Sequence, residues 1–215
     1  MLLKKYFISL ITILTISVSA DPLDPIQLLS DFVGVDTINP PGNESRAVDF
    51  YAKIFEEEGI EYSFGESAPG RGNIWARIKG GDKPALILLQ HTDVVPASKD
   101  YWETDPMVAQ IKDGYLYGRG VIDMKGAGIS QLVSFVRLHR DGKKLNRDLV
   151  FLATADEEAG GLYGAGWMIE NHPEVFEGAG FAINEGGSGM IIDNDKVFSI
   201  EVTQKVPVWV GRTAT

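Results

Sequence analysis

A histidine and an aspartate stand at the end of an apolar run. Residues 86–89 are all Leu or Ile, Gln90 follows, and His91 and Asp93 come next. Such a run, near Gly and Pro, predicts a buried strand. Open α/β sheets place their chemistry beyond the carboxyl ends of these strands, so we expect His91 to face a crevice. Asp93 would then hold the imidazole in one tautomer, as partners of metal-bound histidines do. The alternative for His91 is a capping or core residue.

A glycine-rich loop over residues 118–126 holds one aspartate, Asp123. The glycines allow the backbone to come close to a site, although the loop matches neither phosphate-binding pattern. A helix is predicted from about residue 127 to residue 140. Asp123 therefore has a simpler alternative role as the N-cap of that helix.

Two further stretches place carboxylates directly after apolar runs. Glu157 and Glu158, preceded by another acid, follow residues 149–155, and Glu185 follows a short run over residues 181–183. Adjacent like charges repel, so the acidic triplet over residues 156–158 is expected to be either solvated or balanced by cations.

These residue types have a chemistry in common. One imidazole with several carboxylates suits zinc, manganese or cobalt. A carboxylate can bridge two ions, as in hydrolases that activate a water molecule between two metals, and a carboxylate that is not a ligand can take the proton from that water. The pair Glu157 and Glu158 provides a ligand and a base, but the residues alone leave open which is which.

Composition limits the functions that are available. The chain has 215 residues, 44% of them hydrophobic, which is enough for one sizeable core. Its 30 acidic and 20 basic residues give a net charge of −10, which disfavours a nucleic-acid partner. There is no cysteine, so disulfides, thiolate zinc sites and a cysteine nucleophile are excluded.

The N-terminal region has the pattern of a secretory signal peptide. Lys4 and Lys5 precede an apolar stretch over residues 7–18, and small residues end at Ala20. The stretch is short for a membrane span, which needs about 20 residues, so an uncleaved anchor is the weaker alternative. We expect residues 1–20 to be removed, giving a secreted or periplasmic protein without stable membrane association.

Runs with strand character alternate with helical periods, which predicts an α/β fold. Helices are expected over residues 25–33, from about 45 to 58, 127–140 and 163–171. Strands are expected over residues 60–64, 74–78, the run before His91, 108–111, 115–117, 149–155, 181–183, 190–192 and 197–203.

Four motifs occur in a fixed order. They are HTDVVP at residues 91–96, GRG through DMKG at 118–126, DEE at 156–158 and NEGG at 184–187. Together they resemble the M20 family of zinc peptidases and acylases, most closely its secreted carboxypeptidase and N-acyl-amino-acid hydrolase branch. The resemblance covers about residues 24–210, and four ordered motifs make it specific.

The resemblance implies a role for each candidate. His91 and Glu185 would bind one zinc ion and Glu158 the second, with Asp123 bridging both. Asp93 would orient His91, and Glu157 would be the general base. The reaction would be hydrolysis of an amide bond next to a free carboxylate by a zinc-activated water, in a small peptide or an N-acyl amino acid. Cobalt or manganese could replace zinc.

The resemblance also implies an architecture. Family members have a three-layer α/β catalytic domain with a mostly parallel central sheet flanked by helices. They are about twice this length, with an inserted lid domain and a returning segment that carries a last histidine ligand. We therefore expect residues 21–200 to be the N-terminal part of the catalytic domain and residues 201–215 to begin the lid or a linker, with the C-terminal part missing. A dimer mediated by the lid is not expected for this chain.

Three hypotheses remain at this point. The chain is a shortened metallohydrolase with four of the family's five metal ligands, or a non-catalytic fragment that binds metal, or an unrelated acidic cation-binding domain, which the ordered motifs disfavour. His139 and His172 are not expected to supply the fifth ligand, because each stands at the end of a predicted helix.

Overall fold

The computed structural model describes residues 23–199. The predicted signal peptide, residues 1–20, and the predicted start of the lid or linker, residues 201–215, lie outside the described residues. Within residues 23–199, no helix is long and apolar enough to cross a membrane.

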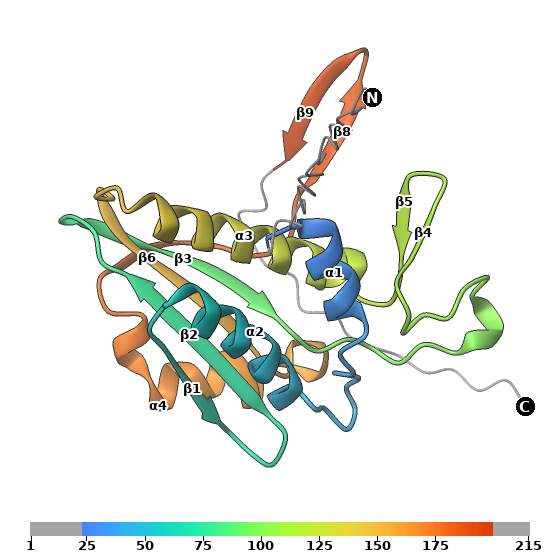
Figure 1. Ribbon diagram of the computed structural model, residues 1–215, viewed down its shortest axis with the longest axis horizontal. Coiled ribbons are helices and arrows are strands. Elements are labelled where there is room, and N and C mark those ends of the chain that lie inside the picture. Colours follow the sequence, from blue (N-terminus) through green and yellow to red (C-terminus); the bar gives the residue numbers. More distant parts are fainter. Residues whose placement is uncertain (1–22, 200–215) are drawn as a thin grey trace, which may run out of the picture.

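A five-stranded sheet forms the centre of the described region, in the order β1-β2-β6-β3-β7 (Figure 1). Its strands are β1 (Tyr62–Glu66), β2 (Gly72–Ile78), β3 (Lys83–His91), β6 (Arg147–Thr154) and β7 (Ala179–Ile183). β3 pairs in parallel with β6 and with β7, whereas β2 is antiparallel to β6 and to β1. Four of these five described strands therefore run in one direction, and the predicted mostly parallel sheet is confirmed.

Helices cover both faces of this sheet and make three layers (Figure 1). One face carries α1 (Pro25–Val33), α2 (Ser45–Glu58) and α3 (Gly126–Asp141), and the other carries the short α4 (Trp167–Asn171). β6 shows the division, because Leu149 and Phe151 pack toward α1 to α3 while Val150 and Leu152 pack toward α4. A strand that is buried on both faces needs a continuous apolar run.

Aromatic rings fill the larger of the two cores. The ring of Phe151 makes edge-on contacts with Tyr51 and Phe55, at centroid distances of 5.3 and 5.4 Å. The Tyr51 hydroxyl donates to Oε1 of Gln90 at 2.8 Å, so its buried polar atom is satisfied. This contact ties α2 to β3 immediately before His91.

Two hairpins extend away from the sheet (Figure 1). One is β4 (Gln110–Lys112) with β5 (Tyr115–Tyr117), and the other is β8 (Ser188–Ile192) with β9 (Asp195–Ser199). Strands were predicted at both places, and residues 200–203 of the strand predicted over 197–203 lie outside the described residues.

The helix predicted over residues 163–171 is the clearest difference from expectation. Only Trp167–Asn171 is regular α-helix, and the segment Leu162–Gly166 contains a kink at Gly164 with φ −110° and ψ −111°. A Cβ at Gly164 would lie 1.7 Å from the carbonyl oxygen of Ala155. The close approach of the backbone after β6 therefore interrupts the helix.

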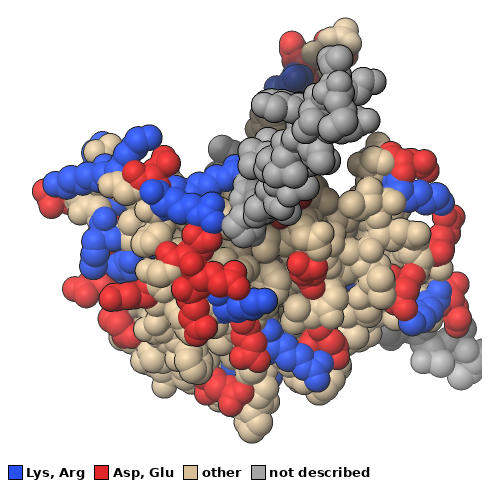
Figure 2. Space-filling model, viewed as in Figure 1, with Lys and Arg blue, Asp and Glu red and all other residues tan. Residues whose placement is uncertain are grey.

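Basic side chains gather at one end of the molecule. On the face shown in Figure 2, the largest group of Lys and Arg lies at the left, around the end of α3 and the loop into β6, whereas acidic side chains are spread across the face. This is the amino end of the parallel strands, opposite to the end at which β3 delivers His91 (Figure 1).

Candidate metal centre

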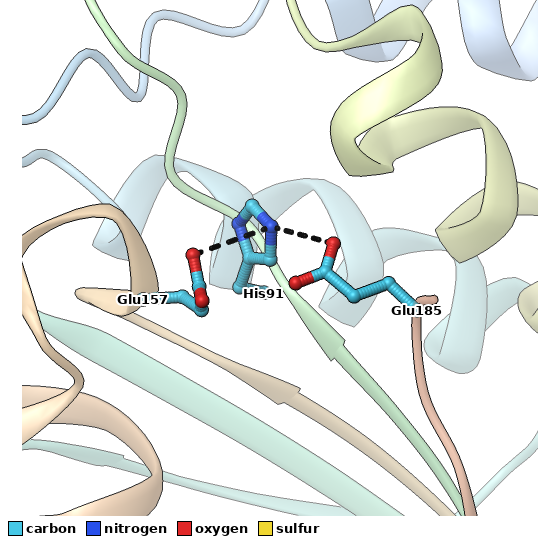
Figure 3. Close-up of side chains that lie close together, drawn as sticks. All are labelled: His91, Glu157 and Glu185. Carbon is cyan, nitrogen blue, oxygen red and sulfur yellow. Dashed lines mark ion pairs between the residues drawn. The ribbon is translucent and has the colours of Figure 1, made fainter. Parts of the chain in front are cut away.

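The parallel strands bring three of the predicted motifs to one edge of the sheet. His91 is the last residue of β3, Glu157 and Glu158 follow β6, and Glu185 follows β7. In Figure 3 the side chains of Glu157 and Glu185 reach the ring of His91 from opposite sides. Strands that are adjacent and parallel must end at the same edge, so this meeting follows from the sheet order.

His91 is the centre of the group. Its side chain is 2% exposed, and its Nε2 atom lies 3.0 Å from Oδ1 of Asp123, 3.4 Å from Oε2 of Glu185 and 3.9 Å from Oε2 of Glu157. Its Nδ1 atom donates to the backbone carbonyl of Asp93 at 3.0 Å. A carbonyl can only accept, so Nδ1 carries the hydrogen and Nε2 is the nitrogen available to a metal ion.

Two sets of side chains could each hold a metal ion, because the potential ligand atoms within each set all lie within 4.8 Å of one another. One set is His91, Glu157 and Glu185, and the other is His91, Asp123 and Glu158. All five predicted metal or base residues are therefore brought together around one imidazole.

Asp123 does not cap the helix that follows it. α3 begins at Gly126, and its N-cap is Lys125, which makes no side-chain capping hydrogen bond. The backbone of Asp123 is extended, with φ −120° and ψ 96°, and its carboxylate meets His91 instead. The simpler alternative for Asp123 is therefore wrong.

A buried lysine anchors the segment that carries Asp123. The Nζ atom of Lys125 donates to the backbone carbonyls of Phe32 at 2.9 Å and Val35 at 2.8 Å, at the C-terminal end of α1. Burial lowers the pKa of Lys125 to about 7, although the negative charge of Asp36 acts in the opposite direction. Sequence reasoning missed this anchor, because a lysine in a glycine-rich loop is expected to be exposed.

Asp93 links His91 to the glutamate pair, Glu157 and Glu158. Its side chain is fully buried, with Oδ1 3.4 Å from Nδ1 of His91. The backbone amides of Glu157 and Glu158 donate to its two carboxylate oxygens, each at 3.1 Å. Asp93 therefore contacts the imidazole of His91 and also fixes the backbone of the glutamate pair.

Burial and the close packing of carboxylates together shift the pKa values of the site. Burial raises the pKa of Glu158 to about 7, reinforced by the negative charge of Asp123. Burial also raises the pKa of Glu157, with Glu185 adding to the shift. Burial alone would lower the pKa of His91, but hydrogen bonds and charges from Asp93 and Glu185 outweigh it and raise that pKa to about 11.

This electrostatic pattern fits a divalent cation. The donors are one imidazole nitrogen and carboxylate oxygens, the set that zinc, manganese and cobalt accept. Without a cation, the raised pKa values of His91, Glu157 and Glu158 favour the binding of protons by these groups, and a metal ion would compete with those protons.

Behind the site lies a buried polar cluster that sequence reasoning did not identify. Its members are Asn39, Glu44, Arg71 and Asp156, each less than 9% exposed. Asp156 belongs to the acidic triplet, and Arg71 pairs with it, so of the two expected alternatives, solvation or balance by cations, the second holds for this residue. The only sequence signal was a set of polar residues beside Gly and Pro, which is equally typical of surface loops.

The remaining two histidines lie at helix ends, as expected. His139 is in the last turn of α3, and His172 follows α4, where its ring contacts Trp75 and Trp167 in tilted arrangements at centroid distances of 4.7 and 4.9 Å. Neither belongs to the two sets of potential ligands.

Comparison with known proteins identifies the family. Residues 87–208 match the model of peptidase family M20/M25/M40, a span of more than half the chain. The chain belongs to this family. The matched span contains His91, Asp123, the glutamate pair and Glu185.

Individual relatives agree with this assignment. Over 194 residues the chain is 30% identical to aminoacylase-1B of Rattus norvegicus, covering 88% of this chain and 46% of the relative. It is 34% identical over 157 residues to succinyl-diaminopimelate desuccinylase of Parvibaculum lavamentivorans, covering 70% and 38%. The chain thus spans less than half the length of these relatives.

Among solved structures, an M20 family metallo-carboxypeptidase from Sulfolobus solfataricus has the same fold. The TM-score is 0.65 at 23% identity, and the alignment covers 76% of this chain and 37% of the other. This similarity confirms the α/β catalytic fold.

Glu44 makes the stability of the metal-free protein depend on pH. Burial raises its pKa from 4.5 to about 7, although its own backbone hydrogen bond and the charge of Arg71 act in the opposite direction. The folded protein therefore holds this proton more tightly than the unfolded chain, and the contribution to stability is complete below pH 4.5 and lost as the pH rises through 7. In Glu44→Gln no proton can leave. Between pH 4.5 and about pH 8, we expect the free energy of unfolding of the wild type to fall by up to about 3 kcal/mol relative to that of this variant.

Urea unfolding at several pH values with a chelator present measures this difference. Glu57→Gln, on the exposed surface of α2, is the matched control. If the free energies of unfolding of the wild type and of Glu44→Gln differ by the same amount at every pH, the prediction is wrong.

Proposed function

We propose that this chain carries the metal-binding part of a hydrolase that cleaves an amide bond next to a free carboxylate. The observation that carries the proposal is the meeting of His91, Asp123, Glu157, Glu158 and Glu185 at one edge of the sheet. Zinc is the proposed metal, two ions in the complete site, with cobalt or manganese as substitutes. Substrates would be small peptides or N-acyl amino acids, the class that the names aminoacylase, desuccinylase and carboxypeptidase of the relatives indicate.

The proposed ligands divide between two ions. His91 and Glu185 would hold one, Glu158 would hold the other, and Asp123 would bridge them. When bound, the ions would polarise the substrate carbonyl and lower the pKa of a water molecule.

Glu157 is the proposed general base. Its side chain is half exposed, so it can reach a substrate, and its raised pKa suits a group that accepts and returns a proton. The Glu157 carboxylate would take a proton from the attacking water and deliver it to the leaving amine. Its neighbour Glu158 is less exposed and is assigned the ligand role.

A second candidate function is metal binding without turnover. It is favoured by the coverage of 46% and 38% of the curated relatives and by the expectation that the family's last histidine ligand comes from a later segment. Metal binding and hydrolysis must therefore be measured separately.

Metal content distinguishes these possibilities. We expect zinc titration calorimetry of the purified chain to show near two ions per molecule if the site is complete, and about one if a ligand is lacking. Asp123→Ala should lose this binding, because Asp123 lies 3.0 Å from Nε2 of His91 in the centre of the group. Asp141→Ala, of similar exposure at the end of α3, is the control. No specific binding by the wild type would reject the metal centre altogether.

The rate of hydrolysis tests whether Glu157 is the general base. With an N-acetyl amino acid or a dipeptide as substrate, Glu157→Gln should keep its metal and lower kcat by about 10²–10⁴-fold, because a general base is worth that much. Glu170→Gln, exposed on α4, should behave as the wild type. Turnover by Glu157→Gln at the wild-type rate would exclude its assignment, and wild-type metal binding without any turnover would favour the second candidate.

We also propose export to the periplasm or outside the cell. The basis is the signal-like pattern of residues 1–20, with Ala20 before the expected cleavage point. The mature protein recovered from cells should begin at Asp21 by N-terminal sequencing. Recovery of the intact sequence from Met1 in the cytosol would contradict export.

A further inference from the structure

The cluster of Asn39, Glu44, Arg71 and Asp156 contains an arginine between two acids. Nη2 of Arg71 pairs with Oδ1 of Asp156 and lies 3.2 Å from Oε1 of Glu44. The side chains of Arg71, Glu44 and Asp156 are 7%, 0% and 5% exposed. A buried ion pair is weak evidence for stability, because its desolvation cost can exceed its attraction, so this cluster calls for another role.

The second guanidinium nitrogen reaches a different segment. Nη1 of Arg71 donates to Oδ1 of Asn39 at 3.2 Å and to the carbonyl of Pro41 at 2.8 Å. The fit is close, since a Cβ at Gly42 would lie 1.6 Å from this nitrogen. One guanidinium therefore fixes both the loop before α2 and Asp156, which precedes the glutamate pair.

Asn39 carries the connection onward to the metal centre. Its Nδ2 atom donates to Oδ2 of Asp93 at 2.8 Å and to Oδ1 of Asp156 at 3.3 Å. Its backbone amide donates to the carbonyl of Val94 at 2.9 Å, so Asn39 is itself held beside the loop that follows His91. The amide side chain thus joins the carboxylate that holds His91 to the residue that precedes Glu157.

Asp156 adopts the conformation that this cluster supports. It has φ 69°, a left-handed backbone uncommon for residues other than glycine. Its amide donates to Oε1 of Glu44 at 3.2 Å, and its Oδ2 accepts from the amide of Tyr163 at 3.0 Å. This conformation directs the chain after β6 so that the amides of Glu157 and Glu158 meet Asp93.

We propose that Arg71 is a positioning residue for the metal centre. Through Asp156 it sets the backbone of Glu157 and Glu158, and through Asn39 it sets Asp93, which holds both His91 and the same two amides. The proposal rests on the proposed metal site, but it assigns a role to a residue that contacts neither the metal ligands nor the substrate.

Replacement of Arg71 tests the proposal by metal affinity. Arg71→Met keeps an unbranched aliphatic side chain, lacks the guanidinium and so removes its four polar contacts. We expect zinc affinity to fall about 10–100-fold, the usual loss when residues that orient metal ligands are changed. Arg77→Met is the matched control, because Arg77 lies near the far end of β2, the strand that Arg71 directly precedes, and pairs with Asp148 at 3.0 Å. It should leave zinc affinity unchanged.

Thermal unfolding with a chelator separates positioning from stability. A purely structural role would lower the melting temperature of metal-free Arg71→Met without changing the zinc affinity of the folded protein, and that result would overturn the proposal. If Arg71→Met does not fold, Arg71→Lys keeps the positive charge but cannot reproduce the four contacts, and it should still bind zinc more weakly than the wild type. Zinc affinity of Arg71→Lys equal to that of the wild type would then overturn the proposal.

The two proposals fail in different ways. Zinc binding by the wild type that is lost in Asp123→Ala but unaffected by either Arg71 variant would leave the metal centre intact and reject only the role of Arg71. Absence of zinc binding in the wild type would reject the metal centre and the role of Arg71 with it.

Discussion

Repulsion among carboxylates is the constraint on which the rest of this structure depends. Asp93, Asp123, Glu157, Glu158 and Glu185 converge on one histidine, and several of them are partly removed from water. Like charges at such short range are unfavourable unless protons or cations neutralise them. In the metal-free protein, burial and neighbouring negative charges raise the pKa of Glu157 and Glu158, and contacts with Asp93 and Glu185 raise the pKa of His91. The fold must hold these groups together against that repulsion, because a cation can use them only if they are already in place.

The structure meets this requirement with backbone-directed hydrogen bonds. Asp93 accepts from two successive amides, which is a stiffer connection than side-chain contacts because it fixes the direction of the chain. Lys125 has the same function on the opposite side, where it donates to two carbonyls at the end of α1. The glycine-rich loop and the segment after β6 are irregular, yet both are tied to regular elements. Sites of this kind need such support, since small displacements of a ligand or base have large effects on chemistry.

Prediction from the sequence succeeded where a residue's position follows from the strand that carries it. His91, Glu157, Glu158 and Glu185 were identified because apolar runs mark buried strands, and parallel strands end at one edge. Asp123 was identified as a candidate, but the choice between a helix cap and a site residue needed the structure, since both roles begin with an aspartate before a helix. The helix predicted over residues 163–171 was wrong in its first turn, because the periodicity of its side chains contains no information on the backbone of Ala155 that approaches Gly164.

The sequence by itself determined the α/β class, the strands that carry the site and the donor atoms available to a metal, because these depend on local apolar patterns and residue chemistry. Only the tertiary structure decided that Arg71, Asn39 and Glu44 are buried behind the site rather than exposed in loops. Three of their contacts join residues that are 32, 112 and 117 positions apart in the chain. Burial of a polar residue depends on partners that distant segments supply, and a local pattern of Gly, Pro and charge does not show which partners those are.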